Sequence, residues 1–180
     1  MKFQNVVIES FAYDLADQVY SSSYIEERLD PLYKKLKLPE GRLELMTGIK
    51  ERRVWPLGTL PSDLSTRAAE KLFLKSRFSK SDVDLLIHAS VCRDFLEPAT
   101  ASVVHANLGL NKKAMIFDLS NACLGVINAF VVAASMIDQG IISCALIVSG
   151  ENGGPLLEST INELLNNESI DRKNIKKYII

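Results

Sequence analysis

Nearly continuous apolar runs alternate along the chain with segments of helical period. VDLLIHASV at 83–91, AMIFDLS at 114–120 and SCALIVSGE at 143–151 are typical of strands covered on both faces in a parallel sheet. Between them the sequence predicts helices over residues 99–108, closed by Gly109, and over residues 123–139, closed by Gly140. Strands that alternate with helices predict an α/β fold with right-handed crossovers.

The first third of the chain continues this alternation. Residues 3–12 carry β-branched and aromatic side chains suited to a strand, and residues 22–37 turn charged and helical in period. A further helix is expected through residues 64–76, capped by Ser62 or Asp63, with one apolar face formed by Leu64, Ala68, Leu72 and Phe73.

Residues 152–180 differ in character from the rest. They are polar, rich in Asn and only partly helical in pattern, and they stop at an apolar YII without a capping turn. An ordinary frayed terminus would account for this composition, but we favour a chain that ends inside a larger fold. We therefore expect one domain over residues 1–151, followed by a polar tail where the fold is cut short.

Composition narrows the class of partner. With 180 residues, 47% of them apolar, the chain is long enough for one domain with a core. A net charge of -1 argues against nucleic-acid and anionic-membrane surfaces, which need a basic excess, so the partner is a small molecule or a protein. The longest apolar stretches, at 126–136 and 141–148, are too short for a bilayer, and we expect a soluble, cytoplasmic protein.

The three cysteines raise the question of chemistry. Cys92, Cys123 and Cys144 form no CxxC pair, and their odd number in a reducing compartment implies free thiols. His88 and His105 lie far from any ligand cluster, so no metal is expected.

Cys123 stands where a predicted strand passes into a helix, and a helix start favours a nucleophilic thiolate. Most lone cysteines are packing residues, however, and spacing alone favours that interpretation, above all for Cys92 and Cys144.

Five collinear segments together resemble the condensing enzymes of the thiolase superfamily, in particular ketoacyl-ACP synthase III and OleA. They are TGIKERRVW at 47–55, SDLSTRAAEKLF at 62–73, VDLLIHASVCRDFLEPATASVVHANLGL at 83–110, FDLSNACLGVINAF at 117–130 and ALIVSGE at 145–151. The resemblance implies an α/β fold corresponding to the N-terminal half of a thiolase-like enzyme, with a mostly parallel sheet and a buried central helix.

The resemblance also implies roles for individual residues. Cys123 would take the acyl group from a thioester, and Glu97 would act as a base in a neighbouring subunit's site. Arg52, Arg53 and Trp55 resemble positions that line the CoA entrance. The alternative for Glu97 is a solvated loop carboxylate, and the alternative for Arg52, Arg53 and Trp55 is a basic loop on the surface. The substrate would be a fatty acyl-CoA or acyl-ACP, with no cofactor and no metal; His88 is expected in the core.

The resemblance implies that catalysis also requires a histidine and an asparagine from a C-terminal half, which this chain does not supply. The first half of such enzymes ends with a further strand in a glycine-rich segment, and residues 152–180 do not match it. Such a half-fold would leave a sheet edge and a helix face uncovered, so we expect a partner. Three interpretations stay open. The chain is one subunit of a split condensing enzyme whose second polypeptide supplies these residues, a truncated copy, or a catalytically silent binding partner of a complete homologue.

Overall fold

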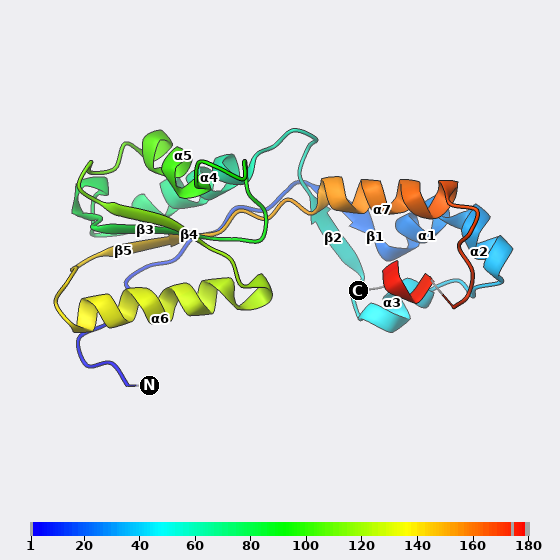
Figure 1. Cartoon of the computed structure of the whole chain (residues 1–180), viewed down its shortest axis with the longest axis horizontal. Helices are drawn as coiled ribbons and strands as arrows, with labels where there is room; N and C mark the ends of the chain where they lie inside the picture. The colour runs from blue at the N-terminus through cyan, green and yellow to red at the C-terminus, as the bar shows by residue number, and fades with distance from the viewer. Residues whose placement is uncertain (1, 174, 179–180) are drawn as a thin grey trace. The chain divides into compact units, whose positions relative to one another are not determined.

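The computed structural model describes residues 2–173 and 175–178, and it forms two compact units (Figure 1). One unit joins the stretch up to Asp14 with Gly58–Asn152, and the other joins Leu15–Leu57 with the stretch from Gly153. The chain passes from the first unit to the second between Asn152 and Gly153, and residues 15–57 are grouped with the stretch that follows Gly153. Of the final YII, positions 179 and 180 lie outside the described residues.

A three-stranded parallel sheet forms the centre of the first unit. Strand β3 (Leu85–Ala89) lies between β4 (Met115–Leu119) and β5 (Ala145–Val148), with Leu86 in register with Ile116 and with Leu146. All five residues of β3 are buried because both faces of the sheet are covered. The three predicted strands and their parallel α/β arrangement are confirmed.

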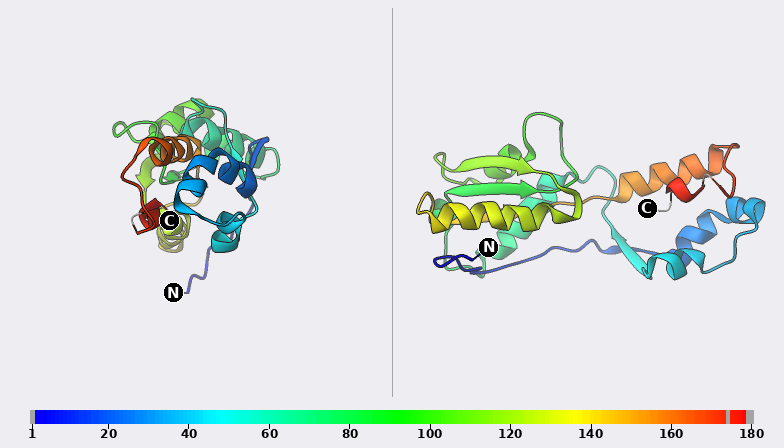
Figure 2. Two further views of the ribbon diagram at one scale, coloured as in Figure 1. Left: turned by 90° about the vertical axis from the view of Figure 1, so that its right-hand side faces the viewer. Right: turned by 60° about the horizontal axis from the view of Figure 1, so that its bottom comes forward.

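Helices cover the two faces of this sheet (Figure 1). Helices α4 (Pro61–Phe73) and α5 (Thr100–Leu108) pack on the face that presents Leu86, and α6 (Gly125–Asp138) packs on the face that presents Leu85 and Ile87. Alternate residues of β3 point to opposite faces, so each face receives its own apolar set. Figure 2 shows α6 along the strands from a second direction.

One predicted helix end is met, and two predicted helix starts differ from the structure. Helix α5 ends at Gly109, which adopts the left-handed φ of 63° that glycine tolerates best. Helix α6 begins at Gly125 rather than at residue 123, because a short 3-10 turn, η2 (Ala122–Leu124), comes before it. The predicted cap of α4 at Ser62 or Asp63 is wrong. The N-cap is Leu60, and Asp63 serves at the third helical position, where its carboxylate accepts the Leu60 N–H at 3.3 Å.

The predicted strand over residues 3–12 is wrong. The segment is extended but belongs to no strand, and its side chains at Val7, Ile8 and Phe11 are 71–77% exposed. A strand requires a hydrogen-bonded neighbour, and none of the described residues pairs with this segment. Instead, Asp138 Oδ1 accepts the backbone N–H groups of Gln4 and Asn5 at 3.0 Å each.

Helix α6, expected as a buried central helix, is buried on one side only among the described residues. Its small residues Gly125, Ala129, Ala133 and Ala134 are buried against the sheet. Leu124 and Ile127, at the start of the helix, are 58% and 57% exposed. A nearly all-apolar helix matches burial on both sides, but the described residues cover only the side that faces the sheet.

The second unit combines a small antiparallel sheet with helices. Strands β1 (Gln18–Ser21) and β2 (Glu51–Val54) pair antiparallel, and the chain between them forms α1 (Ser22–Arg28), α2 (Asp30–Leu36) and α3 (Arg42–Thr47). The helix predicted over 22–37 is thus divided at Leu29, just before Pro31 opens α2. Helix α7 (Gly154–Asn166) and the 3-10 turn η3 (Ile175–Tyr178) complete the unit, and Ile161 and Leu164 are buried in its core. No helix among the described residues has the length and apolar character needed to cross a bilayer.

Candidate active site

Cys123 is presented to solvent by a strained turn. The chain leaves β4, passes through η2 and enters α6, and Leu124 N–H donates to Asn121 O at 2.9 Å within this turn. Ala122 has a φ of 45°, a left-handed conformation that costs a residue with a Cβ about 1–2 kcal/mol. The next residue, Cys123, is exposed. Strain held in this way is typical of functional turns.

Two contacts hold this turn at the carboxyl edge of the sheet. The Asn121 side-chain amide donates to Asn128 Oδ1 at 2.6 Å, which ties the turn to α6. Gly125 is buried over the strand ends, where a Cβ would make ordinary van der Waals contacts, 3.6 Å from Leu119 O and 3.9 Å from the carbonyl carbon of Ala89. The thiol therefore stands on a fixed element, beside the free N–H groups of a 14-residue helix, which stabilise negative charge.

The other two cysteines have environments that disfavour thiolates. Burial raises the pKa of Cys92 above its ordinary value, and the nearby Glu151 carboxylate raises it further. Burial likewise raises the pKa of Cys144, with a further contribution from Asp84. Because the thiolate is the nucleophile, both side chains fit the packing role better than Cys123, which is exposed.

Glu97 lies in the loop that leaves the carboxyl end of β3. Its side chain is exposed, as are those of Phe95 and Leu96. Strands β3 and β4 are parallel neighbours, so the loop with Glu97 and the turn with Cys123 start from the same edge of the sheet. Within the part of the chain that the structure describes, no hydrogen bond joins the two side chains.

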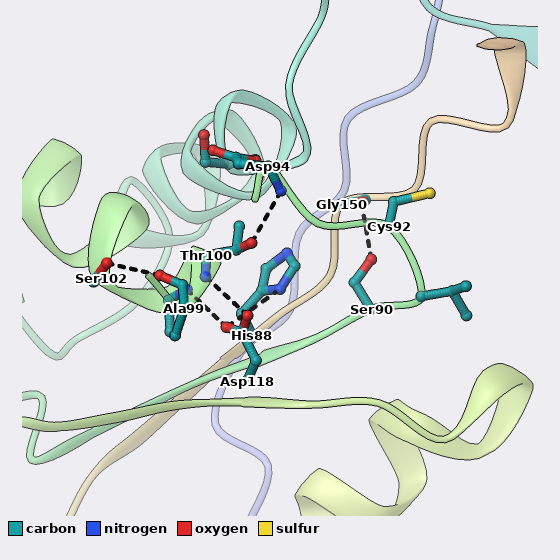
Figure 3. A network of polar contacts seen from close by, with 12 residues as sticks. His88, Ser90, Cys92, Asp94, Ala99, Thr100, Ser102, Asp118 and Gly150 are labelled. Atoms are coloured by element: carbon teal, nitrogen blue, oxygen red, sulfur yellow. Dashed lines mark hydrogen bonds and ion pairs between the residues drawn. The ribbon is translucent and has the colours of Figure 1, made fainter. Parts of the chain in front are cut away.

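A buried polar network behind this edge was not found from the sequence (Figure 3). Asp118 of β4 accepts the backbone N–H groups of Thr100 and Ala101 at 2.8 Å each, and Thr100 Oγ1 accepts the Asp94 N–H at 3.1 Å. His88, predicted in the core, is 1% exposed, and its Nδ1 lies 3.7 Å from Asp118 Oδ1. The feature of the sequence that could have indicated this network is Asp118, an acid inside an otherwise apolar predicted strand.

Arg52, Arg53 and Trp55 belong to the second unit, whereas Cys123 and Glu97 belong to the first. Both guanidinium groups are held locally. Arg52 Nη1 donates to Ser22 Oγ at 2.9 Å, and Arg53 Nη1 donates to the carbonyl oxygen of Ala16 at 2.8 Å.

Trp55 lines a half-open hollow of about 530 Å³ within the second unit. Tyr20 and Tyr24, with rings 5.0 Å apart edge to face, contribute to its wall. Arg28 also lines it, but both of its terminal nitrogens donate to Glu158, at 2.6 and 2.7 Å, so its charge is compensated. The hollow can therefore accept planar or apolar groups more readily than a free anion.

The side chains of residues 2–173, together with the described part of 175–178, offer no group of three metal-ligating residues.

Comparison with known proteins gives one consistent family. The profile of 3-oxoacyl-[acyl-carrier-protein] synthase III matches residues 117–163. An acyl-CoA:acyl-CoA alkyltransferase of Shewanella oneidensis is 42% identical over 165 residues, which are 92% of this chain and 47% of the relative. A β-ketoacyl-[acyl-carrier-protein] synthase III of Aliarcobacter butzleri is 43% identical over 115 residues, or 63% of this chain and 34% of that protein.

Solved structures agree with the sequences. A crystal structure of Xanthomonas campestris OleA with cerulenin superposes with a TM-score of 0.92 at 37% identity, and it covers 98% of this chain and 53% of that one. The chain thus spans about half the length of the relatives that it matches. By sequence and by fold, the chain is similar to about half of a condensing enzyme of the synthase III and OleA kind.

Proposed function

We propose that this chain forms the nucleophile-bearing half of an acyl-thioester condensing site. The observation that carries the proposal is the exposed Cys123 in the turn η2 just before α6, directly after the left-handed Ala122. The reaction class is supported by the names of two relatives, an acyl-CoA:acyl-CoA alkyltransferase and a β-ketoacyl-[acyl-carrier-protein] synthase III. The acyl donor is a fatty acyl-CoA or acyl-ACP.

In the first step the Cys123 thiolate attacks the thioester carbonyl carbon. The carbon–sulfur bond to CoA or ACP breaks, its thiol leaves with the proton that Cys123 gave up, and an acyl-cysteine thioester remains. The free N–H groups at the start of α6 stabilise the oxyanion that develops during this attack.

In the second step Glu97 removes a proton from the carbon next to the carbonyl of a second acyl thioester. The resulting carbanion attacks the acyl-cysteine carbonyl, a carbon–carbon bond forms, and Cys123 leaves as a thiolate. The exposed position of Glu97, on a loop flanked by the exposed Phe95 and Leu96, supports action in a neighbouring subunit's site. We favour acyl-CoA over malonyl-ACP as the second substrate, because decarboxylation of malonyl needs no such base.

We further propose that Arg52, Arg53 and Trp55 contact the CoA portion of the acyl donor. The aromatic hollow that Trp55 lines supports this role for Trp55. A complementary half, in a second polypeptide or a homologous subunit, supplies the histidine and asparagine that stabilise the enolate. The exposed Leu124, just before α6, and the exposed Ile127 of α6 support such a partner, since an apolar face of this kind is normally covered.

Intact-protein mass spectrometry after incubation with a long-chain acyl-CoA tests the proposal. We expect one acyl group per chain, stable to gel filtration and released by neutral hydroxylamine. Cys123→Ala abolishes the adduct, whereas the matched variants Cys92→Ala and Cys144→Ala retain it. Cerulenin, which is bound in solved OleA structures, serves as a second probe of the same thiol. Adducts that persist in Cys123→Ala would contradict the assignment, and no adduct at all would favour a binding partner.

A native mass spectrum of the protein from its source cell tests the second half of the proposal. A complex with a second chain of similar size supports a split enzyme. A single longer polypeptide that contains both halves supports the same chemistry in one chain.

A further inference from the structure

The start of the loop that carries Glu97 is bound, residue by residue, to the segment that follows β5. Strands β3 and β5 pair in parallel up to His88 and Val148. Beyond the strands the same register continues through side chains. Ser90 Oγ donates to Gly150 O at 2.9 Å, Val91 N–H and Cys92 N–H donate to the Glu151 carboxylate at 2.7 and 3.2 Å, and Cys92 Sγ lies 3.7 Å from Asn152 O.

Glu151 is the central member of these contacts. Its two carboxylate oxygens accept from two consecutive backbone N–H groups, Val91 to Oε1 and Cys92 to Oε2. Burial opposes the charge, but the hydrogen bonds from Val91, Cys92 and Ser90 outweigh it and keep the pKa of Glu151 below its ordinary value. The side chain is therefore a charged acceptor at neutral pH, and hydrogen bonds to a charged acceptor are the stronger kind.

The far end of the loop is held as well. Asp94 Oδ1 accepts the Ser62 N–H at 2.9 Å at the start of α4, and Asp94 N–H donates to Thr100 Oγ1. Between these points only the tip around Glu97 is free of such contacts among the described residues. The position of Glu97 at this tip therefore depends on how the two ends of the loop are fixed.

We infer that Glu151 is a positioning residue that fixes the start of the loop carrying Glu97. The inference rests on the proposed role of Glu97. Glu151 itself touches neither substrate nor thiol of Cys123 in this scheme. It acts through the backbone of Val91 and Cys92, and its loss lets the loop move while the nucleophile turn, on the neighbouring strand, stays in place.

The chain offers a matched control at the opposite, amino-terminal end of strands β3 and β5. Asp84 Oδ2 accepts the backbone N–H groups of Ser143 and Cys144 at 2.8 and 3.1 Å, just before β5. Both carboxylates thus bind two consecutive amides, and each raises the pKa of one adjacent cysteine, Cys144 for Asp84 and Cys92 for Glu151. Asp84→Asn removes an equivalent interaction far from Glu97 in the fold.

The first experiment uses the full chain and two probes of the loop. Arg93 is the only arginine or lysine between Lys80 and Lys112, so tryptic cleavage after Arg93 reports opening of the loop. Iodoacetamide labelling of Cys92, resolved from the other thiols by peptide mass spectrometry, reports the loss of the neighbouring charge. Glu151→Gln is expected to raise cleavage at Arg93 about tenfold and Cys92 labelling about threefold. Asp84→Asn is expected to raise labelling of Cys144 and to leave Arg93 and Cys92 unchanged.

A second variant guards against a general folding defect. Ser90→Ala removes one contact of the same series and keeps the Glu151 charge, so a smaller rise in Arg93 cleavage is expected without a change in the pH dependence of Cys92 labelling. Equal effects of Glu151→Gln and Asp84→Asn at Arg93 would overturn the inference, because they would mark a global loss of stability.

The catalytic test uses the complete enzyme. Glu151→Gln is expected to preserve acylation of Cys123 and the KM for the acyl donor, and to lower kcat of the carbon–carbon step about tenfold, with partial rescue by Glu151→Asp. Unchanged kcat in Glu151→Gln, with Glu97→Gln inactive, would overturn the positioning role and leave the proposed function standing. Full condensation activity in Glu97→Gln would instead overturn the role of Glu97 and, with it, the catalytic part of the inference.

Discussion

The Asp118 carboxylate accepts the backbone N–H of Thr100 at 2.8 Å, so that the middle of strand β4 holds the first residue of helix α5. The second oxygen accepts Ala101 N–H at the same distance. A negative side chain thereby satisfies two of the free N–H groups at the start of the helix. Helix α5 directly follows the loop that carries Glu97, so this contact fixes the position where that loop ends.

Asp118→Asn is expected to lower the free energy of unfolding by about 1–3 kcal/mol, because an amide cannot accept both hydrogen bonds through equivalent charged oxygens. Urea denaturation monitored by circular dichroism measures the change. Asp138→Asn is the control, since Asp138 also accepts two backbone N–H groups, those of Gln4 and Asn5, but its hydrogen bonds are exposed whereas those of Asp118 are part-buried. A loss of stability in Asp138→Asn as large as in Asp118→Asn would show that the part-buried position of Asp118 adds nothing.

His88 is expected to make stability depend on pH below neutrality. Burial lowers its pKa from the ordinary 6.5, and this outweighs the attraction of Asp118, Asp94 and Glu151 for the charged form. The unfolded chain therefore binds the proton more readily than the folded chain. Stability is complete above pH 6.5 and declines as the pH falls from there toward the lower folded-state pKa.

Unfolding free energies measured between pH 7.5 and about pH 5 test this dependence. His88→Gln should flatten the decline in this range. A decline that is unchanged in His88→Gln would show that another group titrates.

Gly150 occupies a position that admits no side chain. A Cβ there would collide with the carbonyl oxygen of Pro61 and lie 2.7 Å from Ser65 Oγ. Gly150→Ala is therefore expected to destabilise the fold by about 1–3 kcal/mol through overpacking of α4 against the end of β5. Gly153→Ala is the matched control, since nothing lies within 4 Å of a Cβ at that glycine. Thermal unfolding of the two variants should show a lower Tm only for Gly150→Ala.

The left-handed Ala122 predicts opposite effects for two substitutions. Ala122→Gly removes the steric conflict at a φ of 45° and is expected to raise stability by up to about 1 kcal/mol. Ala122→Val adds a β-branched side chain at the same angle and is expected to lower stability by at least about 1 kcal/mol. Chemical denaturation gives both values, and a destabilised Ala122→Gly would argue that the turn is not strained.

The local sequence determined the main elements of the first unit. Unbroken apolar runs indicate cover on both faces, so strands β3, β4 and β5 and their parallel direction could be predicted from the sequence. The same pattern placed Cys123 between a strand and an apolar helix. Five collinear segments pointed to the family, which the comparisons support.

Only the tertiary structure decided which distant groups meet. Residues 3–12 have the composition of a strand, but a strand forms only where a neighbour supplies hydrogen bonds, and the fold of the described chain supplies none there. Glu151 and the amides of Val91 and Cys92 are about 60 residues apart in sequence, and parallel pairing of β3 with β5 brings them together. Periodicity reports the local environment of a segment. Partners across a sheet follow from strand order and register, which no local pattern encodes.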